Sequence, residues 1–351
     1  MPKALALLSG GLDSRLAIRV IREQGIEVIA LNFLTAFCRC TTSKSCKLEA
    51  LAAAEALGVP IKVVNSTESM VEIVKRPKHG YGKNMNPCID CRINLFREAK
   101  RYMAELGASF IITGEVLGQR PMSQRMDAMR LIDKEAGVTG LVLRPLCAKH
   151  MEPTIPEKDG IVDREKLLAI RGRSRKPQMQ LADLFKLKDY PCPAGGCLLT
   201  DPQFGFRMKD LLAHGDATLN EVHLLKIGRH LRLDPKTKVV VGRDEADNEK
   251  LETFAKEGDV LLMLRDIPGP LTLIRGEVTD EKVTLAARLT ARYSKAQSAP
   301  SAAVLCWPAG NKAAQRSLDV APLEPAQADA LLLVKPEKPR KRGRRPLLQA
   351  E

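Results

Sequence analysis

Hydrophobic and polar positions follow a regular alternation along the first part of the chain. Short apolar runs at residues 4–8, 27–33, 61–64 and 110–112 are typical of buried strands in a parallel sheet. Between them, apolar residues recur every three or four positions, as on one face of a helix. This order of strand, helix and strand predicts a Rossmann-like, doubly wound α/β sheet.

Helices are predicted at three places in this region. Residues 12–21 carry an apolar face that includes Leu12 and Leu16, residues 47–57 end before Gly58, and a third helix runs from about 93 to 106. A later basic stretch, residues 164–187, is predicted to be mostly helical. Each predicted helix can therefore cover a face of the sheet.

The pattern changes after about residue 202. Apolar runs near 239–241 and 259–264, followed by a helix that ends near 291–295, predict a smaller α+β domain. Beyond residue 298 the chain is rich in Ala and Pro and then strongly basic. The predicted domains are residues 1–202, with a nucleotide-binding core at about 1–156, then 203–298, and a disordered basic tail at 299–351.

Composition and charge narrow the class of protein. The 351 residues carry a formal net charge of +14, which favours a polyanionic partner, while an aromatic content of 4% disfavours base stacking as the main binding mode. Residues 335–345 hold seven Lys or Arg against one Glu, a net +6 that attracts nucleic acid without reading its sequence. No apolar run approaches the length of a membrane span, and the N-terminus leads directly into a strand. We therefore expect a cytoplasmic protein that does not bind membranes.

The turn between the first strand and the first helix is the strongest chemical signal. Residues 9–14 read Ser-Gly-Gly-Leu-Asp-Ser. Ser9, Gly10, Gly11 and Ser14 leave backbone amides uncovered at a helix N-terminus, where N–H donors and the helix dipole can hold a phosphate chain. No Gly-Lys-Ser/Thr follows, so this is not a Walker A loop. The alternative is a glycine-rich turn without a ligand.

Cysteine is the second signal. Nine cysteines in a cytoplasmic protein favour metal, redox or sulfur chemistry over a disulfide framework. Two stand alone and are expected to be ordinary thiols, Cys147 and Cys306. The other seven form three groups: Cys38, Cys40 and Cys46; Cys88 and Cys91; Cys192 and Cys197.

Two of these groups are candidates for sulfur chemistry. Cys88 and Cys91 lie near a predicted helix N-terminus, where the dipole lowers a thiol pKa and favours the thiolate. Glycines before Cys197 allow its backbone to approach another group. Cys197 is therefore the candidate for a third thiol that acts with Cys88 and Cys91, and Cys192 is the runner-up. The first group could bind metal, but a thiol-bearing loop over the nucleotide site is the favoured interpretation.

The turn at residues 9–14 resembles the PP-loop of ATP pyrophosphatases, which grips the pyrophosphate that leaves when ATP is cut at its α-phosphate. The resemblance implies the adenine nucleotide alpha hydrolase (HUP-type) fold. It implies that Ser9, Gly10, Gly11 and Ser14 hold the β- and γ-phosphates. Asp13 would lie by the phosphates or their Mg²⁺, and backbone near Asn32 and Phe33 would hold the adenine.

A second segment makes the resemblance more specific. Residues 113–119, Thr-Gly-Glu-Val-Leu-Gly-Gln, are followed by Ser-Gln at 123–124 and Leu-Arg-Pro-Leu at 143–146. Together they resemble the tRNA 4-thiouridine synthases over residues 4–156, which implies that Gly114 and Gln119 belong to the nucleotide site. The Cys88-x-x-Cys91 pair instead looks like other tRNA thiolases, including the 2-thiouridine enzymes.

The second domain resembles a different family. Gly-Arg at 242–243, Asp-Ile-Pro-Gly at 266–269 and Tyr-Ser-Lys at 293–295 occur in the order seen in the NFACT-R domain of ribosome-associated quality-control factors. That module is linked with RNA binding. The basic stretch at residues 171–176 also has the charge density of a phosphate-contacting loop, the alternative being a solvated loop.

Taken together, the resemblances imply an ATP-dependent tRNA sulfurtransferase. It would adenylate a uridine carbonyl oxygen and replace it with sulfur, giving 4-thiouridine in the favoured case and 2-thiouridine in the alternative. Two mechanisms fit Cys88, Cys91 and Cys197: one thiol carries a persulfide that another resolves, or all three ligate a [4Fe–4S] cluster, which the Cys-x-x-Cys spacing favours slightly. Asp13 joins the cysteines as a catalytic candidate.

The implied partners are tRNA and a sulfur donor such as a cysteine desulfurase or sulfide, and a homodimer is compatible. Two other functions stay open. A PP-loop ligase or amidotransferase would deliver nitrogen, but it has no evident need for the cysteines. A non-catalytic tRNA- or ribosome-binding factor would bind ATP without releasing pyrophosphate.

Overall fold

The chain divides into two compact units, Met1–His223 and Leu224–Glu351. A computed structural model describes residues 2–38, 46–187, 190 and 196–336. The division falls later than the predicted boundary at residue 202. The physical reason is that helix α8 (Pro202–His214) packs on the first unit, where the Phe204 ring meets Phe37 edge-on with 6.3 Å between the ring centroids.

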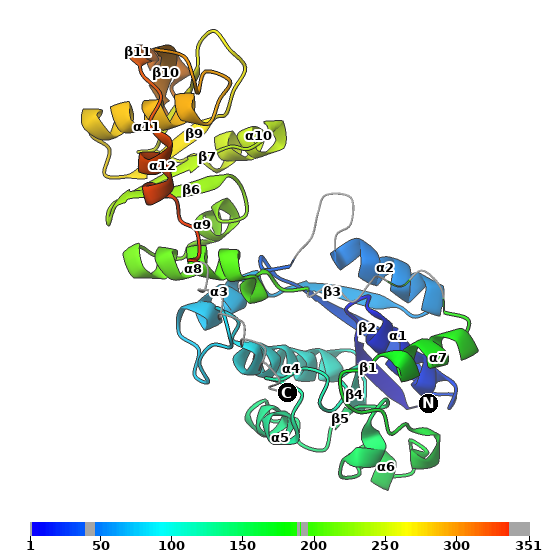
Figure 1. The fold of residues 1–351 in the computed structure, drawn as a ribbon. Helices are drawn as coiled ribbons and strands as arrows, with labels where there is room; N and C mark the ends of the chain where they lie inside the picture. The colour runs from blue at the N-terminus through cyan, green and yellow to red at the C-terminus, as the bar shows by residue number, and fades with distance from the viewer. Residues whose placement is uncertain (1, 39–45, 188–189, 191–195, 337–351) are drawn as a thin grey trace, which may run out of the picture. The chain divides into compact units, whose positions relative to one another are not determined.

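The first unit is built on a five-stranded parallel sheet, with strand order β3-β2-β1-β4-β5 (Figure 1). The first three strands step toward one edge of the sheet, and β4 then pairs on the other side of β1. This reversal is the topological switch point at which open α/β sheets bind ligands. The strands are β1 (Lys3–Leu7), β2 (Glu27–Leu34), β3 (Ile61–Asn65), β4 (Phe110–Thr113) and β5 (Val142–Leu143).

Helices cover both faces of this sheet, so the Rossmann-like fold predicted from the sequence is confirmed. Alternate residues of β1 point to opposite faces: Ala4 and Ala6 join one buried cluster with α1 and α2, and Leu5 and Leu7 join another with α4 and α5. The helices of the unit are α1 (Leu12–Arg22), α2 (Cys46–Leu57), α3 (Thr67–Lys75), α4 (Cys88–Glu105), α5 (Met126–Glu135), α6 (Ile155–Lys158), α7 (Lys176–Leu184), α8, and α9 (Leu219–Leu224), which ends in the second unit. Short 3₁₀ turns occupy Ala148–His150, Arg164–Lys166 and Leu198–Thr200.

The basic stretch at residues 164–187 is less helical than predicted. Outside one 3₁₀ turn and α7, its backbone bonds to other loops: the amides of Leu168 and Ile170 donate to the carbonyls of Pro145 and Leu146 at 2.9 and 2.8 Å. The Gly172 amide donates to the Leu117 carbonyl at 2.7 Å. These long-range bonds replace the local bonds that a helix would need.

The second unit contains a six-stranded antiparallel sheet of order β11-β10-β8-β9-β7-β6. Its two faces pack against helices, one with α11 and α12 and the other with α10, as the α+β prediction requires. The elements are β6 (Arg229–Asp234), β7 (Thr237–Val241), α10 (Glu245–Phe254), β8 (Val260–Leu264), β9 (Thr272–Gly276), α11 (Asp280–Arg292), β10 (Ala302–Pro308), a 3₁₀ turn (Lys312–Ala314), β11 (Arg316–Val320) and α12 (Pro325–Leu331).

Part of the predicted tail folds into this sheet. The prediction of disorder from residue 299 was wrong for β10, β11 and α12, because β10 pairs antiparallel with β8 and buries Val304 and Cys306 in the core. The Ala and Pro content of this segment obscured its strand alternation. Most of the basic run, from residue 337 onward, lies outside the described residues.

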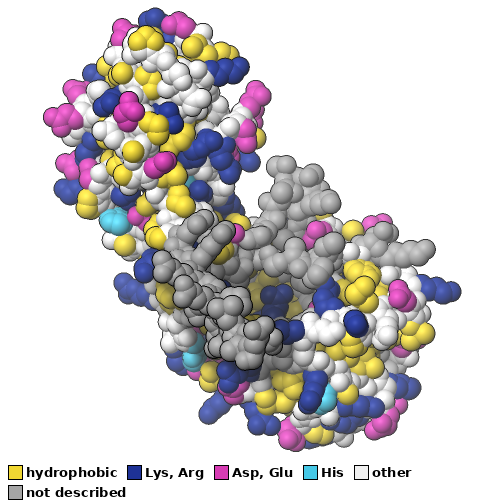
Figure 2. All heavy atoms as spheres, in the orientation of Figure 1, with side chains coloured by type: hydrophobic (Ala, Val, Ile, Leu, Met, Phe, Trp, Pro, Cys, Tyr) yellow, Lys and Arg dark blue, Asp and Glu magenta, His cyan; other side chains and the backbone are white. Residues whose placement is uncertain are grey.

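The surface of the described part is strongly charged. On the face shown in Figure 2, Lys and Arg side chains occur over both units and are interspersed with Asp and Glu. Among the helices that the structure describes, none has the length and apolar character needed to cross a membrane.

Truncating a core leucine of α1 tests this packing. Leu16 is fully buried and Leu184 on α7 is 74% exposed, so Leu16→Ala should lower the free energy of unfolding of the full chain by about 2–5 kcal/mol. The matched change Leu184→Ala should alter it by less than about 0.5 kcal/mol. Urea unfolding followed by circular dichroism measures both, and equal effects would contradict the described core.

Candidate nucleotide and thiol site

The phosphate-loop candidate lies between the end of β1 and the start of α1. Gly10 has φ +81°, and a side chain there would come within 3.0 Å of the Glu49 backbone in α2. The buried Arg15 donates from Nε to the Gly10 carbonyl at 2.9 Å, which stabilises the turn from its buried side. Ser14 Oγ donates to the Gly11 carbonyl at 2.8 Å. These two hydrogen bonds fix the turn. No side chain caps the start of α1, so its first backbone N–H groups can donate to a phosphate.

The segment after β4 packs directly on this turn. A side chain at Gly114 would lie 2.4 Å from the Asp13 carbonyl carbon, so only glycine fits. Gln119 Nε2 donates to Asp13 Oδ2 at 3.1 Å. The structure therefore brings Gly114 and Gln119 to Asp13 across the switch point.

Buried acceptor atoms without a hydrogen-bond partner at this sheet edge include Asp13 Oδ1 and Asn32 Oδ1. Asn32, in β2, uses its amide nitrogen to donate to the Leu8 carbonyl at 2.7 Å, while its neighbour Phe33 packs partly against the core. Buried acceptors are normally paired. Their state here suits a ligand that brings a cation or an N–H donor.

A buried ionic network, which the sequence did not reveal, supports the same segment. Glu115 is 2% exposed and accepts from Arg144 Nε at 3.0 Å, with Arg92 Nε 3.2 Å from its other oxygen. Arg144 also forms a two-pronged ion pair with Asp133 at 2.7 and 2.8 Å. Glu115 belongs to the motif at residues 113–119 and Arg144 to the motif at residues 143–146, but only the fold shows that the two side chains form an ion pair.

The cysteine groups lie close together in space. Cys88 and Cys91 occupy the first turn of α4, and Cys38 and Cys197 form an isolated antiparallel bridge. The structure thus brings Cys197 to the Cys88–Cys91 group, as proposed, and adds Cys38, whose role the sequence left open. Cys40, Cys192 and the Cys46 side chain lie outside the described residues. Cys306 is buried in the second unit, and the buried Cys147 donates from Sγ to the Glu115 carbonyl at 3.4 Å.

Contacts connect this thiol cluster (Cys38, Cys88, Cys91 and Cys197) with the nucleotide segment. Arg92, next to Cys91, pairs with Glu115, next to Gly114. Asn86 donates to Cys88 Sγ at 3.2 Å and approaches Met122 Sδ at 3.8 Å, just beyond Gln119. Arg92 and Asn86 therefore link the cluster to the segment that carries Gly114 and Gln119.

The predicted thiolate character of the helix N-terminus is wrong for Cys91. Burial raises the pKa of Cys91 to about 12, with Arg92 opposing the shift and the thiols of Cys197, Cys88 and Cys38 adding to it. Burial also raises the pKa of Cys197 to about 11. Desolvation here outweighs the helix dipole, so both thiols are protonated at neutral pH.

The thiols are not arranged as a metal site. Within the described residues, no group of three or more His, Cys, Asp or Glu side chains is placed to hold a metal ion. None of the six described cysteines is in a disulfide.

The basic loop at residues 171–176 lies beside the nucleotide segment. Arg171 forms a parallel bridge with Leu117, and Gly172 packs on Gly118. Arg171 and Arg173 are exposed. The loop thus lies against the segment that carries Gln119.

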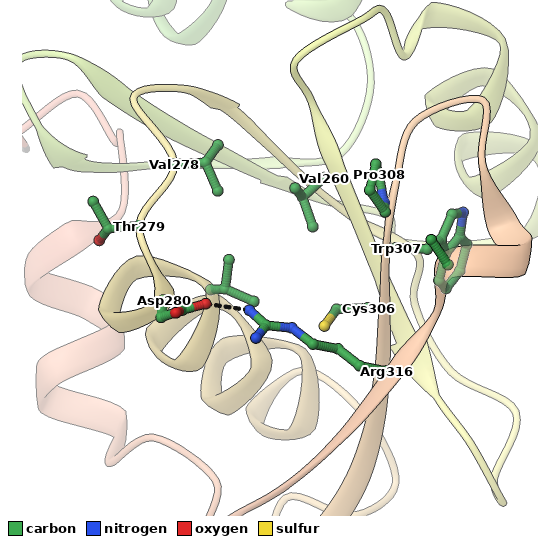
Figure 3. Close-up of a pocket in the computed structure, with 10 residues that line it drawn as sticks. Val260, Val278, Thr279, Asp280, Cys306, Trp307, Pro308 and Arg316 are labelled. Atoms are coloured by element: carbon green, nitrogen blue, oxygen red, sulfur yellow. Dashed lines mark hydrogen bonds and ion pairs between the residues drawn. The ribbon is translucent and has the colours of Figure 1, made fainter.

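A separate pocket lies in the second unit, between α11 and the β10–β11 end of the sheet (Figure 3). It measures about 440 Å³, and Arg316 from β11 reaches across it to pair with Asp280 at the start of α11. It contains none of the predicted site residues.

Comparison with known proteins assigns both units. Residues 1–160 match the family described as thiamine biosynthesis protein (ThiI), and residues 228–331 match the NFACT protein RNA binding domain. We refer to residues 1–160 as the ThiI domain and to residues 228–331 as the NFACT domain, after the families that they match. Both resemblances found in the sequence are confirmed, and the NFACT match begins and ends later than the predicted 203–298.

Curated relatives of the ThiI domain carry sulfur-transfer names. The chain is 34% identical over 160 residues to a probable tRNA sulfurtransferase of Ureaplasma parvum, covering 44% of this chain and 38% of that protein. It is 28% identical over 180 residues to that of Thermococcus kodakarensis, covering 51% and 44%. It is 36% identical over 124 residues to the tRNA-specific 2-thiouridylase MnmA of Clostridium acetobutylicum, covering 32% and 35%. The chain spans less than half the length of each.

The raised thiol pKa values predict how the ThiI domain reacts with alkylating agents. At pH 7.5, Cys91 and Cys197 should be alkylated by iodoacetamide at least tenfold more slowly than in urea-unfolded protein, because the folded thiols are almost wholly protonated. Their rates should keep rising to about pH 11 without a plateau near 8.5. Peptide mapping measures each site, and fast labelling of Cys91 at neutral pH would contradict the described environment.

Proposed function

We propose that this protein is an ATP-dependent tRNA uridine thiolase, forming 4-thiouridine in the favoured case and 2-thiouridine in the alternative. The observation that supports the proposal is a chain of contacts: Gly114 packs on Asp13 of the candidate phosphate turn, and Glu115 pairs with Arg92, which follows Cys91 of the thiol cluster. The relatives named tRNA sulfurtransferase and 2-thiouridylase support the same reaction class.

The proposed first step activates the base. A uridine carbonyl oxygen attacks the α-phosphate of ATP, an O–P bond forms, and the bond to the β-phosphate breaks to release pyrophosphate. Ser9, Gly10, Gly11 and Ser14 would hold the β- and γ-phosphates through backbone amides and hydroxyls, where charge builds on the leaving group. Backbone near Asn32 and Phe33 would hold the adenine.

Asp13 is the residue that fits Mg²⁺ in this step. Its Oδ1 is buried without a partner while Gln119 fixes Oδ2, and Mg²⁺ prefers carboxylate and phosphate oxygens. The ion would neutralise phosphate charge. Gln119 then serves to orient the carboxylate, and Gly114 to allow the close approach that brings it there.

The proposed second step delivers sulfur. Because Cys197 pairs through its backbone with a second cysteine, Cys38, we favour a persulfide on Cys197 over an iron–sulfur cluster. Its terminal sulfur replaces the adenylated oxygen, and AMP leaves. Cys88 and Cys91 lie in the first turn of α4 and are partly buried, which would limit the access of water to the activated carbon. The donor of the persulfide sulfur would be a cysteine desulfurase or sulfide.

The RNA partner is supported by three separate features. The NFACT match gives the second unit an RNA-binding family, the loop at 171–176 places basic side chains beside the crevice, and the net charge is +14. tRNA is therefore the proposed substrate, and the cytoplasm the proposed location. A homodimer stays an expectation of the resemblance, to be tested by sedimentation of the full chain.

One alternative has support of its own. A non-catalytic factor that binds tRNA or ribosomes would also need the NFACT domain and could use the nucleotide site as a sensor. It gives no reason for the thiol cluster to border that site. A PP-loop ligase or amidotransferase leaves the cluster equally unexplained.

Variants at the two parts of the site test the reaction. Asp13→Ala and Cys197→Ala should each reduce thionucleoside in tRNA by at least a hundredfold, because one removes phosphate and metal binding and the other the sulfur carrier. Cys306→Ala, a buried cysteine of the second unit, should leave it unchanged. Mass spectrometry of tRNA nucleosides from a deletion strain complemented with each variant measures this. Normal thionucleoside with Cys197→Ala would move the carrier role to Cys192.

Removing charge from the basic loop tests RNA contact. Arg171→Ala combined with Arg173→Ala should weaken tRNA binding several-fold and lower the salt slope by about 0.7–0.9 per lost phosphate contact. Arg130→Ala combined with Lys134→Ala removes the same charge from α5 and serves as the control. Filter binding over a salt series measures both, and equal losses would show that only net charge matters.

A further inference from the structure

The bridge between Cys38 and Cys197 has the geometry of a cross-strand thiol pair. The Leu198 amide donates to the Phe37 carbonyl at 2.7 Å, so the hydrogen bond flanks the two cysteines and does not join them. They are therefore a non-hydrogen-bonded antiparallel pair, in which Cα atoms lie about 4.5 Å apart and side chains are closest. Disulfides use Cα separations of about 4.4–6.8 Å.

Buried neighbours hold both sides of this pair. Phe37, directly before Cys38, is 1% exposed and meets Phe204 of α8 edge-on. On the other side, Leu199 is fully buried, and the Thr200 carbonyl accepts from Asn84 Nδ2 at 2.8 Å. The approach of Cys38 to Cys197 is therefore set by packing of the adjacent residues.

We propose that Cys38 is the resolving thiol of sulfur transfer, the group that forms a disulfide with Cys197 and releases its sulfur. The inference rests on the proposed function and deepens it. On the sequence alone, the thiol that resolves the persulfide is one of Cys88, Cys91 and Cys197. Among the described residues, however, no such backbone pairing joins α4 to Cys197. Cys38 is the thiol that the backbone aligns with the carrier.

The transfer step needs only the Cys38 thiol and the Cys197 persulfide. Cys38 Sγ attacks Sγ of the Cys197 persulfide, a Cys38–Cys197 disulfide forms, and the bond from Cys197 Sγ to the outer sulfur breaks. The outer sulfur takes the electron pair and the Cys38 proton and leaves as hydrosulfide, which attacks the adenylated carbon and expels AMP. The two protein thiols are oxidised and the outer sulfur is reduced. A small dithiol or a dithiol protein reductant must then restore the pair.

A redox titration tests the pairing without requiring turnover. Full-length reduced protein is equilibrated with mixtures of reduced and oxidised glutathione, alkylated, and mapped by mass spectrometry under non-reducing conditions. We expect a Cys38–Cys197 linked peptide as the dominant disulfide, present in Cys91→Ser and Cys88→Ser and lost in Cys38→Ser. A Cys91–Cys197 link in its place, or no link to Cys38, would overturn the proposal.

Turnover then separates this proposal from the function on which it rests. With persulfide-loaded protein, ATP and tRNA, Cys38→Ser should form at least tenfold less thionucleoside than wild type but release pyrophosphate at the wild-type rate. Wild-type yield from Cys38→Ser would overturn the resolving role while leaving the thiolase intact. If wild type itself made no thionucleoside, the proposed function would fail, and the glutathione titration would still decide the Cys38–Cys197 pairing.

Discussion

The close packing of Gly114 on the Asp13 peptide is the contact on which the rest of the site depends. It joins the segment after β4 to the turn after β1, at the topological switch point, where β2 and β4 lie on opposite sides of β1. No side chain fits between them, so Asp13 is held near Gln119 with one carboxylate oxygen left unpaired. A parallel sheet offers such a crevice only at its switch point, and here both nucleotide motifs meet in it.

The same constraint links the thiol cluster to the candidate nucleotide site. Glu115 follows Gly114 and is buried, so it needs the Arg144 and Arg92 guanidinium groups to offset its desolvation. Arg92 follows Cys91, and its position therefore fixes the first turn of α4 against the crevice. Burial raises the pKa values of the Cys91 and Cys197 thiols and keeps both protonated at neutral pH. These two thiols should therefore react slowly with electrophiles at neutral pH.

The sequence predicted most of this fold because its signals were local. Apolar runs, glycine-rich turns and the Ser-Gly-Gly-Leu-Asp-Ser motif each act over a few residues, and β1, α1 and β2 appear where these patterns predict them. The failures have a common physical cause in long-range pairing. Part of the stretch after residue 298 forms β10 because it pairs with β8. Residues 168–172 form backbone hydrogen bonds with distant loops and not with one another. The pairing of Cys38 with Cys197 and the Glu115–Arg144 contact belong to the same class, since no local pattern encodes them.

The central claim is that the ThiI domain uses ATP to make a base oxygen replaceable, and the thiol cluster then supplies sulfur. The most direct measurement is release of pyrophosphate from ATP by the full-length protein, with and without bulk tRNA. We predict release that depends on tRNA and is lost in Asp13→Ala. ATP binding without tRNA-dependent pyrophosphate release would contradict the account and would favour a nucleotide-responsive RNA-binding factor.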